Sequence, residues 1–345
     1  MAQPPRRLGR SPRNVRSGQN PDTGVAAGRR ERLAPLAAYT QRMNRVLDQI
    51  DAHLDAPLEV AQLAEVAHFS PFHFHRVFTA WMGETLGDYL RRRRLEVAAA
   101  RLAGQRQTPV LHVALSVGFG SGEAFARAFK THFGQTPSAW RATTEQRWAE
   151  ELLQQRRKHD QVERKFDQAP AAAGSDTSGV NHPTPTEFPM PVTLATLPPV
   201  RIAYLRHIGP YGPSVEAFWR QAFFPWMHAN DLAGRVCYGI GHDDPGITAP
   251  ENCRYDAGVE IAADATPGSP AGVALLPGGR YALADYRGTG AGIGRAWSEF
   301  MRDWLPNSGL QIDSRPFFER YPINPDYNPA TGEFNCQLCI PVKPL

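Results

Sequence analysis

One stretch of helical sequence occurs twice in this chain, 51 residues apart. The copies span residues 70–78 and 121–129, and their serines, phenylalanines, one arginine and a following glycine align without a gap. Each serine is a natural helix N-cap, and phenylalanines four residues apart lie on one face of a helix. A shorter apolar helix is predicted before each copy, over 57–67 and 109–117. The repeat therefore predicts two helix-turn-helix units side by side.

The face of each repeated helix opposite its apolar stripe is predicted to read DNA. Arg76 and Arg127 occupy the same outer position, from which an arginine can bond guanine through O6 and N7, while Glu123 can accept from a cytosine amine. The arginine run at 91–94 suits phosphate contacts or a solvated helix face. His132 is placed on the inner stripe of the second copy. The residues predicted to contact DNA are Phe72, His73, His75, Arg76, Thr79, Arg91, Arg92, Gly122, Glu123, Arg127 and Lys130.

The net charge of +4 is unevenly distributed along the chain. Residues 1–35 carry eight basic against two acidic residues, residues 36–158 sixteen against twelve, and residues 191–345 twelve against fifteen. A basic first half suits phosphate, and an acidic second half suits a neutral or cationic ligand. No apolar run is long enough to span a membrane, and the N-terminus lacks the apolar core of a secretory signal. We therefore expect a cytoplasmic protein with no membrane partner.

Composition divides the chain into four parts. Residues 1–35 are rich in Arg, Pro and Gly without apolar periodicity, so we expect disorder, either as a basic arm on DNA or as an unstructured leader. Residues 36–145 are helical throughout. Residues 146–190 combine a polar helical extension with a linker rich in Pro and Gly. Residues 191–345 alternate strand and helix patterns, which predicts a multidomain chain with an all-α part before an α+β part.

The C-terminal part also repeats itself. Trp219 and Trp226 recur 78 residues later as Trp297 and Trp304, each pair following a strand and a glycine-containing turn. A strand–helix–strand–strand unit that occurs twice in the sequence predicts a pseudo-symmetric α+β domain with a cleft between its halves. A carboxylate among aromatic rings suits an organic cation; alternatively, the tryptophans are core and the glutamates salt-bridged or exposed. The candidate ligand-binding residues are Tyr211, Trp219, Trp226, Tyr255, Glu260, Trp297, Glu319 and Tyr321.

A Cys-x-x-Cys sequence, Cys336 and Cys339, falls within a predicted strand. Residues three apart on a strand point to opposite faces and cannot easily share a metal. We therefore expect reduced core cysteines. No metal site, cofactor or catalytic residue is predicted.

Residues 39–142 resemble the DNA-binding domain of the AraC/XylS family of bacterial transcription regulators. The resemblance is carried by Gly118-Phe119, by Ala128-Phe129-Lys130 and, most specifically, by 133–138 (Phe-Gly-Gln-Thr-Pro-Ser). It implies two helix-turn-helix units joined by a long helix at about 86–102, with recognition helices in successive major grooves roughly 34 Å apart. The family usually has glycine in the first turn, where this chain has His68, so we expect a strained but intact turn.

Residues 191–345 resemble the GyrI-like small-molecule-binding domain, of the SHS2-type fold. The matching segments are 204–211, 242–245, 276–282 and 315–319. The resemblance implies that an acidic residue in the central cleft binds effectors, often lipophilic cations, a role that falls on Glu319 and less directly on Glu260.

Together, the two resemblances imply a transcription regulator that binds double-stranded DNA and a small-molecule effector. The effector would change DNA occupancy or the contact with RNA polymerase. Two alternatives remain for the C-terminal part: a small-molecule hydrolase with Glu319 and Tyr211 as acid and base, or a protein-binding module.

Overall fold

The computed structural model describes residues 22–105, 107–144, 146–147, 190–313, 315–323, 326–328 and 330–344, with side chains from residue 36 onward. Residues 1–21 and 148–189 lie outside the described residues, as do most of the expected disordered segment and linker. In the part of the chain that is described, none of the helices combines the length and the hydrophobicity that crossing a membrane requires.

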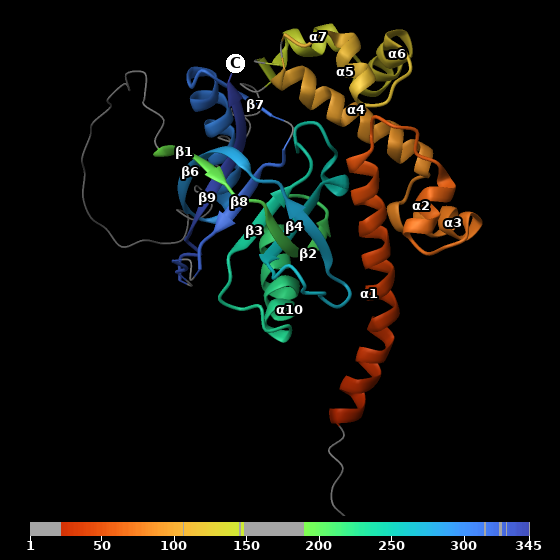
Figure 1. The fold of residues 1–345 in the computed structure, drawn as a ribbon, viewed down its shortest axis with the longest axis vertical. Coiled ribbons are helices and arrows are strands. Elements are labelled where there is room, and N and C mark those ends of the chain that lie inside the picture. Colours follow the sequence, from red (N-terminus) through yellow and green to blue (C-terminus); the bar gives the residue numbers. More distant parts are fainter. Residues whose placement is uncertain are drawn as a thin grey trace, which may run out of the picture.

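The helical half of the protein is organised by two long helices, α1 (Asp22–Ala52) and α4 (Leu86–Gly104). Helices α2 (Val60–Val66) and α3 (Pro71–Met82) pack beside α1 at one end of α4, and α5 (Val110–Ser116), α6 (Gly122–Phe133) and α7 (Pro137–Ala142) surround its other end (Figure 1). The two predicted helix-turn-helix units are thus joined by α4. Helix α1 begins at Asp22, so residues 22–35 are helical where we expected no regular structure.

The repeated sequence produces the same helix ends twice. The hydroxyls of Ser70 and Ser121 accept the N–H of the third residue of α3 and α6. Gly83 and Gly134 end these helices with φ of 74° and 75°, a left-handed conformation that favours glycine. Each unit has its own core, in which the repeated phenylalanines are fully buried: Phe74 and Phe78 in the first, Phe125 and Phe129 in the second. Only His132 departs from the predicted stripe, because it is exposed and Phe133 packs in its place.

The turn of the first unit contains the left-handed residue that we expected. His68 is exposed with φ 55°, and Gly118 takes the equivalent place in the second unit with φ 83°. A left-handed backbone conformation costs a residue with a side chain roughly 1–2 kcal/mol. Replacement by glycine removes this cost, but part of the gain is lost because glycine makes the unfolded chain more flexible and so raises the entropic cost of folding. We expect His68→Gly to raise the free energy of unfolding by about 0.5–1 kcal/mol in urea titrations. His112→Gly, on the exposed face of α5, should instead lower it by about 1 kcal/mol; a loss of stability in both variants would contradict strain at His68.

The C-terminal part is an antiparallel sheet whose strand order is symmetric. The strand order is β1-β6-β9-β8-β3-β4-β2-β5, with β8 and β3 paired at the centre. Outward from this pair, β9, β6 and β1 on one side correspond to β4, β2 and β5 on the other, and β7 pairs with β9. This confirms the predicted α+β duplication. The strands are β1 (Val192–Leu197), β2 (Val200–Ile208), β3 (Cys237–Gly241), β4 (Arg254–Glu260), β5 (Gly272–Leu276), β6 (Gly279–Gly288), β7 (Leu310–Ile312), β8 (Phe318–Tyr321) and β9 (Phe334–Pro344).

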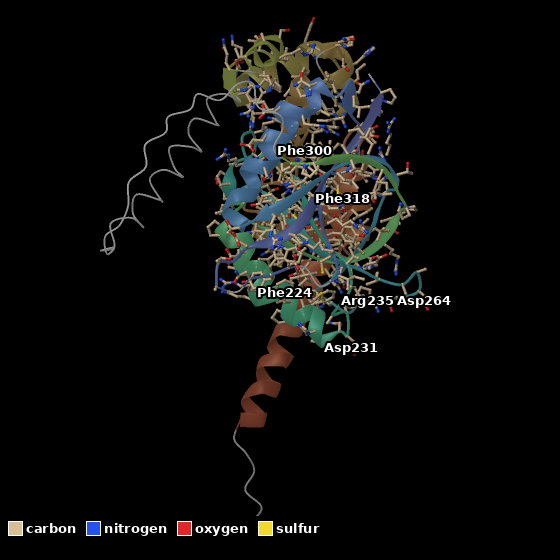
Figure 2. All side chains as sticks on the ribbon, turned by 90° about the vertical axis from the view of Figure 1, so that its left-hand side faces the viewer. Phe224, Asp231, Arg235, Asp264, Phe300 and Phe318 are labelled. Atoms are coloured by element: carbon tan, nitrogen blue, oxygen red, sulfur yellow. The ribbon has the colours of Figure 1, made fainter. Side chains whose placement is uncertain are left out.

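A helical segment follows β2 and a second one follows β6. The first comprises α9 (Pro213–Phe218), a π-helical turn (Trp219–Phe223) and α10 (Phe224–Ala229); the second comprises α11 (Gly290–Glu299) and a π-helical turn (Phe300–Trp304). Figure 2 shows Phe300 and Phe318 in the interior of this domain, with Asp231, Arg235 and Asp264 at one end. Phe223 and Phe300, one from each segment, are fully buried.

Candidate DNA-binding surface and effector cage

The predicted DNA-reading side chains lie on the outer faces of α3 and α6. Both helices lie on the side of α1 and α4 that faces away from the sheet (Figure 1). On α3, Phe72 is 75% exposed and the guanidinium of Arg76 lies over its ring, 5.9 Å from the ring centre. The other exposed members of the predicted set on these helices are His73, His75, Glu123, Arg127 and Lys130, whereas Thr79 and Gly122 are partly buried.

The arginine run on α4 is not the uniformly exposed face that we expected. Only Arg91 is exposed. Arg92 is 14% exposed, and its guanidinium forms ion pairs with Glu84 at 2.5 Å and Glu96 at 3.1 Å. Because Arg92 is committed to these carboxylates, it does not offer the solvent-facing charge that a phosphate contact requires. Arg91 lines a hollow of about 280 Å³ together with Gly87, Leu90, Arg94 and Phe119.

Arg94 ties α4 to the connection between α1 and α2. Its guanidinium donates to the carbonyl oxygens of Leu54 and Ala56, both at 3.0 Å. Gly118 lies directly against this contact: a Cβ there would overlap the Leu54 carbonyl and approach the Arg94 guanidinium to 2.8 Å. The second turn thus needs glycine for space as well as for its backbone conformation, whereas His68 in the first turn is exposed.

At the centre of the sheet, the carboxylate of Glu319 is enclosed by hydroxyl and indole donors. Its Oε2 accepts from the hydroxyl of Tyr255 at 2.7 Å and of Tyr321 at 2.9 Å, and its Oε1 accepts from the indole N–H of Trp297 at 3.2 Å. The indole N–H of Trp219 donates to the Tyr255 hydroxyl at 3.2 Å. These five residues form the Glu319 cage.

Glu319 is 8% exposed, and no ion pair involves it within the described residues. Burial raises the pKa of its carboxyl above the usual value, although the three hydrogen bonds act in the opposite direction. Burial, followed by the charge of Glu319, also raises the pKa of Tyr255 and of Tyr321. The cage therefore holds an acid whose ionised form has no cationic partner among the described residues and would be stabilised by one.

Gly239 leaves the space that the cage occupies, although it was not among the predicted ligand-binding residues. It lies on β3 directly opposite Glu319. A Cβ at this position would overlap both the Tyr255 hydroxyl and the Glu319 carboxylate. The available signal was a glycine inside a predicted strand, which often marks a close approach of other groups to the backbone.

Three of the predicted ligand-binding residues lie outside the cage. The ring of Tyr211 lies 6.1 Å from that of Tyr255, but its hydroxyl is directed to backbone groups near β4. Trp226 packs against the core under α10. Glu260 lies on the other face of β4 from Tyr255, because residues an odd number apart on a strand point to opposite faces. Contrary to expectation, the structure therefore separates Glu260 from Glu319.

The Cys-x-x-Cys sequence forms part of the core. Cys336 and Cys339 are buried free thiols that belong to two different hydrophobic clusters, as their opposite orientation on β9 requires. Burial raises the pKa of both thiols. The prediction that both cysteines belong to the core is confirmed.

Comparison with known proteins matches the two halves of the chain separately. Residues 63–143 match a helix-turn-helix domain, and residues 190–343 match the GyrI-like small-molecule-binding domain. Together with the duplicated helix-turn-helix and the duplicated sheet, these matches define the class: a DNA-binding transcription regulator with a domain for a small-molecule effector.

Some relatives match most of this chain, and others match a shorter segment of it. The right origin-binding protein of Escherichia coli (strain K12) is 26% identical over 312 residues, which cover 85% of this chain and 95% of the relative. The regulatory protein SoxS of the same strain is 37% identical over 92 residues, 27% of this chain and 85% of SoxS. The SPbeta prophage-derived protein YosT of Bacillus subtilis (strain 168) is 34% identical over 155 residues, 45% of this chain and all of YosT. The chain belongs to the AraC-type transcription regulators that carry a GyrI-like domain.

Proposed function

We propose that this regulator reads a two-part DNA site with α3 and α6 and responds to an aromatic or lipophilic organic cation at the Glu319 cage. The observation that carries the ligand class is Glu319 itself, a buried carboxylate surrounded by four aromatic side chains and without an ion pair among the described residues. A cation placed there would gain both the charge of the carboxylate and the negative faces of the rings.

Ligand entry requires part of the cage to move, because hydrogen bonds between its own members now close it. Trp219 and Trp297 are both partly exposed. Trp219 opens the first π-helical turn, and Trp297 lies three residues before the second. Such turns interrupt regular helical hydrogen bonding and occur frequently at functional sites. We infer that one or both indoles swing aside to admit the ligand.

On the DNA side, Arg127→Ala should weaken binding to the specific site by about 1–3 kcal/mol, because a bidentate contact to guanine is lost. The site is first obtained by genome-wide selection with the full-length protein at near-physiological salt, where we expect two half-sites about one helical turn apart. Dissociation constants are then measured on that site and on random DNA. Arg91→Ala, at a proposed phosphate contact, should weaken both equally; an equal loss for Arg127→Ala would assign Arg127 to phosphate as well.

We further propose that the output is a change in DNA occupancy or in a contact with RNA polymerase rather than catalysis. The hydroxyl of Tyr211, the partner that hydrolysis with Glu319 would need, donates to the carbonyl oxygen of Arg254 at 2.7 Å instead of facing the cage. Transcription in vitro from a promoter with the selected site, with and without tetraphenylphosphonium as a probe cation, tests this output. Chemical conversion of ligands by the purified protein would favour the hydrolase alternative.

A further inference from the structure

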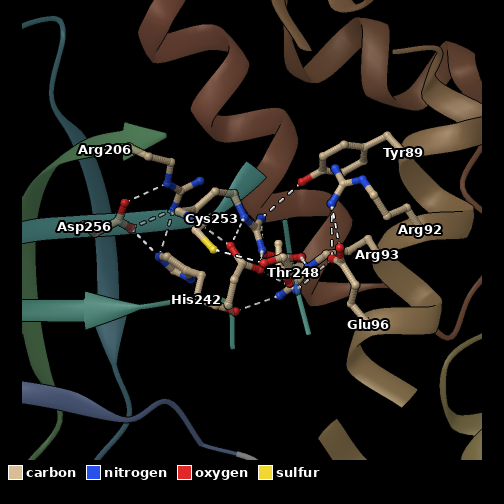
Figure 3. A network of polar contacts seen from close by, with 12 residues as sticks. Tyr89, Arg92, Arg93, Glu96, Arg206, His242, Thr248, Cys253 and Asp256 are labelled. Carbon is tan, nitrogen blue, oxygen red and sulfur yellow. Dashed lines mark hydrogen bonds and ion pairs between the residues drawn. The ribbon is translucent and has the colours of Figure 1, made fainter. Parts of the chain in front are cut away.

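The two domains meet at a cluster of four charged side chains, three of which are nearly fully buried. Arg93 of α4 and Asp51 of α1 belong to the DNA-binding domain, and Asp243 and Arg254 belong to the effector domain. Each arginine bonds both aspartates: Arg93 at 2.9 Å to Asp51 and 2.6 Å to Asp243, Arg254 at 2.7 Å to Asp51 and 2.9 Å to Asp243. Figure 3 shows the surrounding polar network between α4 and the strands. These four residues form the interface cluster.

The interface cluster is electrically balanced and mostly buried, with Asp51 at its rim 23% exposed. The side chains of Arg254 and Asp243 are 2% and 1% exposed. Burial would raise the pKa of Asp51, but Arg254 and Arg93 hold that pKa well below its usual range. Moving the domains apart or sideways would leave charges unpaired in a low-dielectric interior, which is costly. The cluster therefore permits few relative positions of the two domains.

A second ionic contact holds α1 to the sheet. The guanidinium of Arg206 bonds Asp48 of α1 at 2.8 Å and the carboxylate of Asp256 at 2.7 Å. The hydroxyl of Tyr204 also donates to Asp48. Helix α4 is in turn hydrogen-bonded to the effector domain through Arg93 and Tyr89.

Tyr211 connects the interface cluster to the Glu319 cage. Its hydroxyl donates to the carbonyl oxygen of Arg254 at 2.7 Å and accepts the backbone N–H of Asp243 at 3.2 Å. Its ring packs edge-on against Tyr255, whose hydroxyl holds Glu319. Arg254 and Tyr255 are neighbours on β4, so the residue that bonds Glu319 and a member of the interface cluster share one segment of backbone.

We propose that the interface cluster couples effector binding at the Glu319 cage to the position of α4. In this way it controls the angle between the two recognition helices, α3 and α6. Helix α4 joins the two helix-turn-helix units, and a shift of Arg93 alters the angle between α3 and α6. Because both helices must enter successive grooves together, a small change in that angle changes DNA affinity. This regulation rests on the proposed function of the cage.

The test measures the dissociation constant of the full-length protein for its selected DNA site, with and without saturating tetraphenylphosphonium. In the wild type we expect the cation to change DNA affinity at least fivefold, roughly the lower end of typical coupling, and DNA to change cation affinity by the same factor. The double variant Asp51→Asn with Arg93→Met removes one charge of each sign and leaves the Arg254–Asp243 pair intact. Tyr211→Phe removes only a hydroxyl, so it serves if the double variant fails to fold.

In both variants the coupling factor should fall to within twofold of unity, whatever their separate affinities for DNA and cation. The matched control is Glu84→Gln, which removes one of the two carboxylates bonded to Arg92 inside the DNA-binding domain, leaves the Arg92–Glu96 pair in place, and should keep the wild-type factor. Wild-type coupling in the folded variants would overturn the inference, as would a wild type that binds both ligands without coupling. If the wild-type protein does not bind tetraphenylphosphonium, the proposed ligand class is wrong. The proposed coupling, which rests on that ligand class, is then overturned as well.

Discussion

Glu319→Gln should weaken binding of tetraphenylphosphonium by about 2–5 kcal/mol, the usual effect of removing one member of a buried charge pair. The glutamine keeps the shape of the side chain, so the aromatic walls of the cage remain. Binding of triphenylphosphine oxide, which has similar rings but no net charge, should change little. Isothermal titration calorimetry with the two probes separates the charge of Glu319 from the apolar contribution of the cage. Equal losses for both probes would show that the carboxylate acts only through structure.

The same variant should remove a pH dependence that follows from the raised pKa of Glu319. Above pH 4.5, the ordinary value for this carboxyl, the unfolded chain loses the proton while the folded protein still holds it. The free energy of unfolding of the wild type should therefore fall as pH rises from 4.5 through the raised pKa. Over the same window the affinity for the cation should rise, because binding favours the ionised carboxylate. Glu319→Gln should show neither slope, whereas Glu216→Gln, at an exposed position on α9, should keep both; a flat wild-type profile would contradict this account.

Arg254→Met should destabilise the protein by about 3–5 kcal/mol, because the buried Asp243 and the partly buried Asp51 would be left with Arg93 as their shared partner. The surface change Arg287→Met removes an ion pair whose members are 75% and 69% exposed, and should stay within about 0.5 kcal/mol of the wild type. Urea unfolding gives both values.

The effect of Arg254→Met should itself depend on pH in a defined direction. Charges of Arg254 and Arg93 depress the pKa of Asp51 and Asp243 against the opposing effect of burial. A depressed carboxyl stabilises the fold above its unfolded value of 3.8, and this contribution is lost as pH falls below that value. The difference between wild type and variant should be full at neutral pH and shrink below about pH 4. A small difference at pH 7 would mean that water reaches the interface cluster.

The features that the sequence predicted correctly are those with local or repeated signals. Ser70 and Ser121, with phenylalanines at fixed spacing behind them, specify a capped amphipathic helix wherever they occur. Glu319 could be singled out because a charged residue stands within an apolar strand. Glu260 has the same local appearance, yet its odd separation from Tyr255 on β4 places it on the other face; counting this parity would have separated the two glutamates.

The domain interface could not be predicted in this way. Arg93 stands in a run of arginines that local reasoning treats as one surface, whereas the structure exposes Arg91 and buries Arg93. Which member of such a run becomes buried depends on Asp243, 150 positions along the chain, and on the docking of α4 against β4. Helical periodicity contains no information about a partner in another domain.

The strand pairing at the centre of the sheet has a consequence for stoichiometry. The duplicated halves contribute different residues at the point where they meet: β8 supplies the carboxylate of Glu319, and β3 supplies Gly239, which leaves space for it. The carboxylate of Glu319 and the glycine opposite it thus break the symmetry that the backbone preserves. Two equivalent halves thus place one carboxylate at the β3–β8 pair, so each chain is expected to accept one cation there, in one orientation relative to the two halves.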